Sequence, residues 1–102
     1  MDVRFLPNPY FVEELKALPG TDPRVANYVF RFRESLDFVA RLQEFLDYLL
    51  PLYEREGKAY LTVAIGCTGG KHRSVAIAEK MGKIYEGAFQ VRMRHRDLED
   101  SP

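Results

Sequence analysis

The stretch Tyr60-Leu-Thr-Val-Ala-Ile-Gly-Cys-Thr-Gly-Gly-Lys-His-Arg-Ser74 decides the predicted fold of this chain. Residues 60–65 form a continuous apolar and β-branched run, which is typical of a strand covered on both faces. Small residues follow, and a helical pattern begins at about Lys71. Such a strand–turn–helix junction directs backbone N–H groups and the positive end of a helix dipole at one point. We therefore expect an anion to bind at the turn 66–74.

A second strand is predicted after this helix. The helical pattern covers about residues 71–86 and ends at Gly87. Residues 89–96 then alternate between apolar and polar side chains, as a strand with one covered face does. Two strands joined by a helix form a βαβ unit, in which the strands are parallel and the crossover is right-handed.

The first half of the chain predicts a short strand and several helices. Residues 2–6 form the strand, and the two prolines around Asn8 stop it. A brief helix is expected over residues 11–18, and a second begins with Asp22 as its N-cap and Pro23 at its first position. The best-supported helix covers residues 36–53, where apolar residues recur at spacings of three and four.

These elements predict one domain, residues 1–102, of the α/β class. We expect a small three-layer structure with a mostly parallel sheet of about three to four strands, covered by helices. Pro51 falls late in the long helix and is expected to kink or end it. The wide apolar stripe of that helix, which includes Leu36 and Phe45, is expected to face the core, with a dimer interface as the less favoured alternative.

The composition excludes several classes of protein. The chain has 102 residues, of which 46% are hydrophobic, and 15 basic residues balance 15 acidic ones. Cys67 is the only cysteine, so no internal disulfide forms, which fits the reducing cytoplasm. No leader sequence and no apolar run of membrane-spanning length is present, so we expect a cytoplasmic protein without membrane contact.

A second interpretation of the turn is nucleophilic catalysis. Cys67 and Arg73 have the Cys-x5-Arg-Ser spacing of cysteine-dependent phosphatases, in which a thiolate attacks phosphorus and the arginine holds the phosphate oxygens. The general acid would be Asp22 or Asp97. Gly66, however, stands where those enzymes carry a histidine, and a packed, inert cysteine is the favoured alternative for Cys67. We therefore expect no enzymatic activity.

Neither a nucleotide motif nor a metal site is predicted. The Walker A pattern requires four residues between its glycines and a Ser or Thr after the lysine, whereas three residues separate Gly66 from Gly70 and His72 follows Lys71. With His95, the chain has only two histidines and one thiol, which do not form a metal-binding spacing. We expect no cofactor.

A basic cluster lies in the last predicted strand. It comprises Arg92, Arg94, His95 and Arg96. Alternating arginines commonly mark the solvent face of a strand, but a parallel strand would also bring this cluster to the same sheet edge as the turn. The two together would form a basic rim suited to a phosphorylated ligand or to an RNA backbone.

Three stretches, in this order, carry a resemblance to a known family. They are Asp2-Val-Arg-Phe-Leu-Pro-Asn-Pro9, residues 60–75 and Arg94-His95-Arg96. The chain closely resembles the C-terminal domain of the RapZ/YvcJ family over essentially its whole length. The resemblance implies an α/β domain similar to a phosphofructokinase subdomain that self-associates as a homo-oligomer, such as a dimer. Family members usually carry a preceding P-loop domain. The sequence 1–102 does not include that domain, so we do not expect nucleotide hydrolysis from it.

The resemblance also implies a function and a site. Relatives act as RNase adaptors that present small RNAs to an endoribonuclease and bind glucosamine 6-phosphate, which adjusts amino-sugar synthesis. Tyr10 stands where some relatives place a histidine. The binding residues implied for this chain are Asn8, Tyr10, Thr68, Gly69, Gly70, Lys71, His72, Arg73 and Ser74.

We therefore predict a non-catalytic domain that senses a phosphorylated amino sugar and binds RNA or a protein partner. The anion pocket is expected at Gly66–Ser74. The phosphatase and a purely structural oligomerisation domain are the alternatives.

Overall fold

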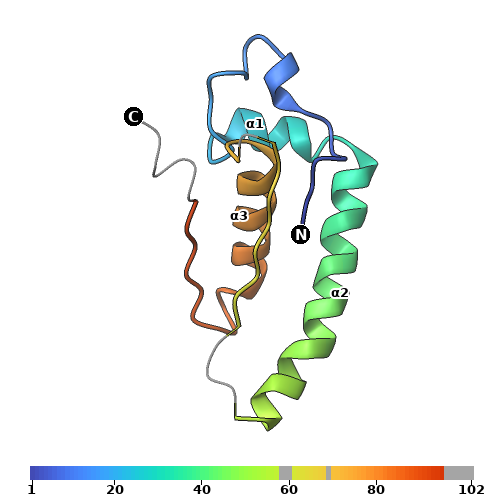
Figure 1. Ribbon diagram of the computed structural model, residues 1–102, viewed down its shortest axis with the longest axis vertical. Helices are drawn as coiled ribbons and strands as arrows, with labels where there is room; N and C mark the ends of the chain where they lie inside the picture. Colours follow the sequence, from blue (N-terminus) through green and yellow to red (C-terminus); the bar gives the residue numbers. More distant parts are fainter. Residues whose placement is uncertain (58–60, 69, 96–102) are drawn as a thin grey trace.

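The computed structural model describes residues 1–57, 61–68 and 70–95. The chain begins with a short 3₁₀ turn and continues with three α-helices (Figure 1). These elements are η1 (Pro9–Phe11), α1 (Pro23–Val29), α2 (Arg33–Arg55) and α3 (Arg73–Tyr85).

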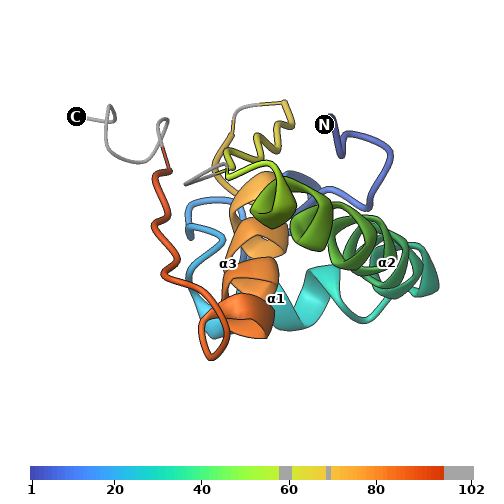
Figure 2. The same ribbon diagram turned by 90° about the horizontal axis from the view of Figure 1, so that it is seen from below.

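The predicted α/β class is wrong: within the described residues the structure contains helices and no strand. Residues 61–65 and 91–95 are extended, but they flank different sides of α3 and form no ladder with each other (Figures 1 and 2). One isolated parallel bridge, between Asp2 and Gly66, is the trace of the expected sheet. The three-layer parallel sheet, the βαβ unit and the similarity to a phosphofructokinase subdomain are therefore corrected to a three-helix domain edged by extended segments.

The exposure of the extended segments explains why they do not form the predicted sheet. A central parallel strand is covered on both faces, whereas Thr62, Val63 and Ala64 are exposed. Both extended segments line an open cavity of about 1600 Å³ that α2 and α3 also border. The apolar pattern of residues 61–65 thus reflects the wall of this cavity and not a paired strand.

The prediction of the long amphipathic helix is confirmed. Its apolar period places Val39, Leu42 and Leu46 on the buried face of α2. The helix runs through Pro51 to Arg55, so the proline does not end it. The predicted stripe was too wide, because Leu36 is 52% exposed and Phe45 is 57% exposed.

The core lies between the helices and the N-terminal segment. Val3 and Leu6 of this segment, Val25 and Val29 of α1, and Ile77 of α3 are almost completely buried. α3 contacts both α1 and α2, so it is the central helix. Its placement decides where the turn before it points.

The connections between elements match their predicted chemistry only in part. Asp22 caps α1 by accepting a hydrogen bond from Arg24 N–H at 2.9 Å, and Pro23 is the first helical residue, as expected. Asn8 caps η1 through the N–H of Tyr10. The helix expected over residues 11–18 is wrong, because η1 ends at Phe11 and only turns follow it.

Gly20 allows the loop before α1 to lie directly against the start of α3. Its N–H donates to Lys71 O at 2.6 Å, and a Cβ atom at this position would meet His72 O and lie 2.7 Å from Val75 Cβ. The loop therefore helps to position the turn.

We expect Gly20→Ala to destabilise the fold by about 1–3 kcal/mol, because the added methyl group overlaps the backbone of α3. Thermal unfolding followed by circular dichroism measures the loss. Gly87→Ala is the matched control, because nothing lies within 4 Å of a Cβ atom there. Equal melting temperatures for the two variants would contradict the close contact.

Tyr85, the last residue of α3, ties this helix to α2. Its hydroxyl lies 3.2 Å from Gln43 O and 2.7 Å from Asp47 Oδ1. Burial, together with the hydrogen bond to Asp47 and its negative charge, raises the pKa of Tyr85 to about 12. A raised pKa means that the folded state stabilises the neutral phenol. The contribution of the Tyr85 hydroxyl to the free energy of unfolding is therefore complete below pH 10 and is lost as the pH rises toward 12.

We expect Tyr85→Phe to lower the free energy of unfolding by about 0.5–1.5 kcal/mol at neutral pH. The difference from wild type should shrink between pH 10 and 12, where the phenol ionises. Urea unfolding at several pH values measures both effects. Tyr48→Phe serves as the control, because Tyr48 is 67% exposed.

Candidate functional site

The candidate site is the turn between the extended segment 61–65 and α3. Gly70 has φ 64°, a left-handed conformation that favours glycine, and this lets the chain turn into the helix. The N-cap residue of α3, His72, forms no side-chain cap. The N-cap side chain thus offers no acceptor to the N–H groups of the first turn of α3, and the helix dipole adds partial positive charge there.

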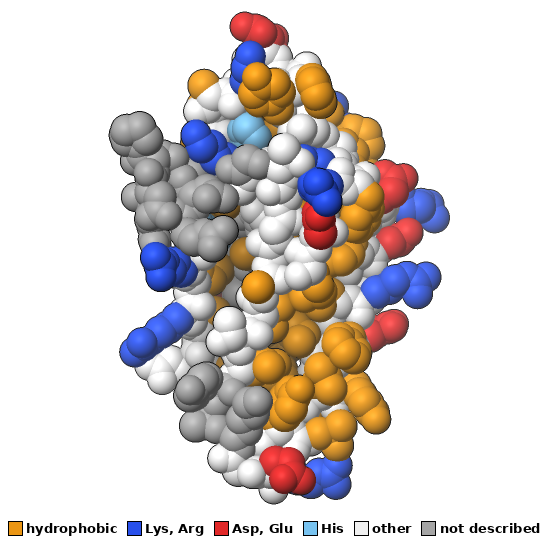
Figure 3. Space-filling view, in the orientation of Figure 1, with side chains coloured by type: hydrophobic (Ala, Val, Ile, Leu, Met, Phe, Trp, Pro, Cys, Tyr) orange, Lys and Arg blue, Asp and Glu red, His pale blue; other side chains and the backbone are white. Residues whose placement is uncertain are grey.

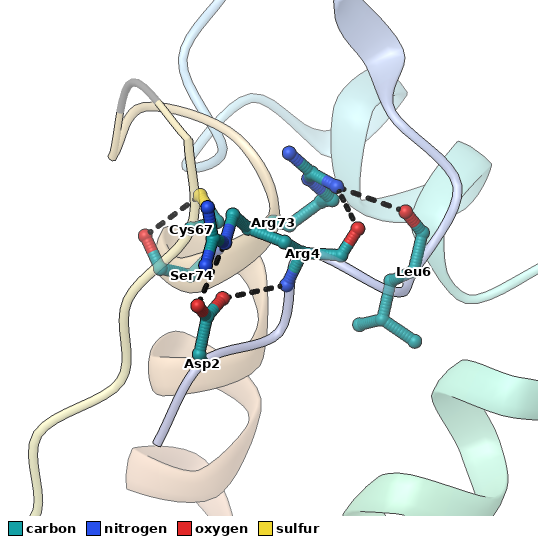
Figure 4. Close-up of polar contacts among 6 residues, drawn as sticks. All are labelled: Asp2, Arg4, Leu6, Cys67, Arg73 and Ser74. Atoms are coloured by element: carbon teal, nitrogen blue, oxygen red, sulfur yellow. Dashed lines mark hydrogen bonds and ion pairs between the residues drawn. The ribbon is translucent and has the colours of Figure 1, made fainter.

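Cys67 and Ser74 close the turn from opposite ends. The Ser74 N–H donates to Cys67 Sγ at 3.3 Å, and Sγ lies 3.3 Å from Ser74 Oγ (Figure 4). Burial raises the pKa of the Cys67 thiol, but hydrogen bonds from Ser74 and from the N–H of Gly70, together with the charge of Arg73, more than offset this effect. The net shift is downward, so the turn stabilises negative charge at the sulfur.

The side chain of Arg73 leads away from the thiol toward the N-terminal segment (Figure 4). Its Nη1 donates to Arg4 O at 2.5 Å and to Leu6 O at 3.1 Å. Arg73 is only 4% exposed. In this structure the guanidinium therefore holds two backbone carbonyls and does not close over Cys67 as the phosphatase interpretation requires.

Sequence reasoning missed two charged residues at the site. Asp2 and Arg4 line the same cavity as Cys67, Thr68, Gly70 and Ser74. Arg4 Nε lies 2.7 Å from Asp2 Oδ2, and the hydrogen bond from the Arg4 N–H, followed by the Arg4 side chain, outweighs desolvation and lowers the pKa of Asp2. The prediction that strands 2–6 and 60–65 belong to one mostly parallel sheet was the signal that could have found them.

The structure brings only part of the predicted set together. Thr68, Gly70 and Ser74 line the cavity. Lys71 is exposed beside them, and His72 is buried with its Nε2 atom unpartnered.

Asn8 and Tyr10 do not join the cavity lining. The Asn8 side chain caps η1, and Tyr10 stacks under Lys16, whose Nζ lies 4.5 Å from the ring centroid. Gly69, Asp97 and Arg96 lie outside the described residues. Asp22, the other candidate acid, caps α1 and pairs with Arg24 at 3.0 Å.

Three residues of the predicted basic cluster border the cavity. Arg92, Arg94 and His95 line it from the segment that follows α3. His95 Nε2 lies 2.7 Å from Glu79 Oε1, and this contact holds the segment against α3. Met93 contributes by packing over Gly82, where a Cβ atom would lie 2.8 Å from its Sδ.

Metal binding finds no support in the described residues, among which no three His, Cys, Asp or Glu side chains gather closely enough to hold an ion. None of the described helices has the length and apolar character needed to cross a membrane.

Fold and turn together define a small helical domain in which the turn before the central helix stabilises negative charge on Cys67. The family model described as the RapZ C-terminal domain matches residues 1–99. The chain therefore belongs to the RapZ C-terminal domain family, as its sequence predicts.

Curated relatives agree with this assignment. A nucleotide-binding protein of Brevibacillus brevis (strain 47) is 55% identical over 96% of this chain and 33% of its own length. Nucleotide-binding proteins of Anaeromyxobacter sp. (strain K) and Geobacter metallireducens are 59% and 55% identical, each over 97% of this chain and over 34% and 35% of their own lengths. The chain spans about a third of the length of the curated relatives it matches.

We expect Cys67 to react with iodoacetamide at a pH midpoint below the ordinary thiol value of 9.0, because the turn stabilises the thiolate. Ser74→Ala should move the midpoint upward, since it removes the hydroxyl that donates to the thiolate. Mass spectrometry of the alkylated protein between pH 6 and 10 gives the rates. A midpoint at or above 9.0 in the wild-type protein would contradict the stabilisation of the thiolate by the turn.

Proposed function

We propose that this domain is a non-catalytic sensor of a phosphorylated amino sugar. The observation that carries the proposal is the start of α3, where the N-cap side chain forms no hydrogen bond and the preceding turn, which includes Thr68 and Lys71, already stabilises a negative sulfur. A phosphate group binds to N–H groups of this kind through charge-assisted hydrogen bonds. Family membership supports a regulatory role of this kind and no specific ligand.

The charges around the cavity favour a ligand that is both anionic and cationic. Asp2 lies on the same cavity as the phosphate-binding turn. Its lowered pKa keeps the carboxylate ionised, so it suits the ammonium group of an amino sugar. Glucosamine 6-phosphate carries both groups, and we propose it as the ligand.

RNA or protein binding by the same domain is the second part of the proposal. Arg92 and Arg94 line the cavity and are exposed, so they suit RNA phosphates. Apolar side chains gather over the C-terminal half of α2 (Figure 3), where Tyr48 is 67% exposed, and this surface suits self-association or an endoribonuclease partner. As a cytoplasmic adaptor, the domain would then present RNA according to the ligand it holds.

The structure favours this proposal over the two alternatives. A cysteine-dependent phosphatase needs an arginine facing its thiolate, whereas the Arg73 guanidinium donates to Arg4 O and Leu6 O. A purely structural oligomerisation domain has no need for Asp2, Thr68 and Lys71 beside an uncapped helix start. Binding without catalysis uses all of these groups.

We expect glucosamine 6-phosphate to raise the melting temperature of the wild-type protein, because it binds the folded state only. Lys71→Ala should weaken this binding roughly tenfold, since one charge-assisted hydrogen bond is lost. Thermal shift over a ligand titration gives both values. The matched control is Lys83→Ala, which removes an exposed lysine from the opposite end of α3.

Two further ligands sharpen this test. Glucosamine without phosphate should not stabilise the protein, and inorganic phosphate should do so at higher concentration. Equal stabilisation by glucosamine 6-phosphate in Lys71→Ala and wild type would exclude the turn as the phosphate site. Hydrolysis of the sugar phosphate that disappears in Cys67→Ser would instead support the phosphatase.

A further inference from the structure

Among the residues that the structure describes, Arg73 carries a buried positive charge without a counter-ion. The residue is 4% exposed, and no carboxylate of residues 1–57, 61–68 and 70–95 forms an ion pair with it. Its Nε atom is buried and has no hydrogen-bond partner. A buried cation in this condition is costly and is strongly stabilised by an anion that reaches it.

The hydrogen-bond acceptors of the guanidinium are neutral groups instead. Nη1 donates to Arg4 O and Leu6 O, both in the N-terminal segment 1–6. A phosphate oxygen is a stronger acceptor for guanidinium than a backbone carbonyl and can accept two parallel hydrogen bonds. The two carbonyls are therefore acceptors that a phosphate can replace.

The N-terminal segment has few other polar attachments. Val3 N–H donates to Gly66 O at 2.7 Å, and Gly66 N–H donates to Met1 O at 2.6 Å. In the described part of the chain, Arg73 is the only side chain from outside the segment that forms a hydrogen bond with Arg4 or Leu6. Loss of its two bonds would leave this half of the segment held to the rest of the domain by the packing of Phe5 and Leu6.

We propose that an anion at the turn draws the Arg73 guanidinium away from Arg4 O and Leu6 O and so loosens the segment 1–6. The inference rests on the proposed anion site and adds a coupling between that site and the N-terminal segment. Because such coupling is reciprocal, anything that lifts the segment also strengthens anion binding by the same factor.

The position of Arg73 makes this exchange feasible. It is the first residue of α3, so its backbone already belongs to the turn. Its flexible three-carbon stem can carry the guanidinium from the segment to the mouth of the turn. Its charge already contributes to the lowered pKa of Cys67, so its field reaches the site in the ligand-free structure.

The segment is placed to pass the change on to α2. The ring of Phe5 contacts the ring of Phe38 edge-on, with 5.7 Å between the centroids, and Phe5 is 60% exposed. Movement of the segment would shift this aromatic contact on the surface of α2. Binding of an anion at the turn would thus change the surface of α2 around Phe38, outside the cavity.

Amide hydrogen exchange of the whole chain tests the proposal. We expect saturating inorganic phosphate to speed the exchange of the Val3 and Leu6 amides by about tenfold, within the usual range of allosteric coupling. Sodium chloride at equal ionic strength is the control for screening. Exchange that slows or stays constant while phosphate stabilises the protein would overturn the coupling and leave the anion site standing. Absence of any stabilisation by phosphate would overturn both.

Two variants define the role of Arg73. Arg73→Ala should exchange rapidly at Val3 and Leu6 without phosphate, with no further increase when phosphate is added. Lys71→Ala keeps the carbonyl bonds of Arg73, so it should show the slow wild-type exchange and need more phosphate to reach the fast one. A phosphate response retained in Arg73→Ala would contradict the exchange of partners. The wild-type comparison alone decides the outcome if Arg73→Ala does not fold.

Discussion

The hydrogen bonds from the Arg73 guanidinium to Arg4 O and Leu6 O are the interaction on which the arrangement of this domain depends. They join the first segment of the chain to the first residue of its central helix, across almost seventy residues of sequence. The segment that they hold places Val3 and Leu6 in the core, where these side chains are 0% and 2% exposed. Burial of two such side chains stabilises the fold by several kcal/mol, about 1.5–3 kcal/mol for each.

α3 takes its central place from contacts on several sides. Gly20 lets the loop before α1 approach its first turn, and Tyr85 ties its last residue to α2. Met93 packs over Gly82, and His95 pairs with Glu79, so the segment after the helix also lies against it. Because both ends are held, the turn before α3 keeps one orientation toward the cavity.

The turn stabilises negative charge on the Cys67 sulfur, and the same physics would act on the phosphate of the proposed ligand. Its N–H groups, the helix dipole and nearby cations lower the pKa of Cys67 despite partial burial. The direction of the Arg73 side chain distinguishes catalysis by the thiolate from binding of a phosphate. Held on backbone carbonyls, its guanidinium leaves the thiolate without the partner that catalysis needs, whereas the N–H groups remain suited to binding.

The sequence by itself determined the local features and the family. Helix α2 follows from apolar spacing, the cap at Asp22 from side-chain chemistry, and the tight turn before α3 from small residues, because each depends on neighbours a few residues apart. Family membership follows from motifs that are read directly from the chain.

Tertiary structure alone decided the features that depend on distant partners. A strand needs a ladder with another segment, and residues 61–65 and 91–95 are extended without forming one, so the apolar pattern predicted a sheet that the described residues do not form. The exposure of Phe45 depends on which faces of α2 other elements cover. The acceptors of Arg73 lie in the first residues of the chain, and only the folded backbone brings them to the helix that carries it.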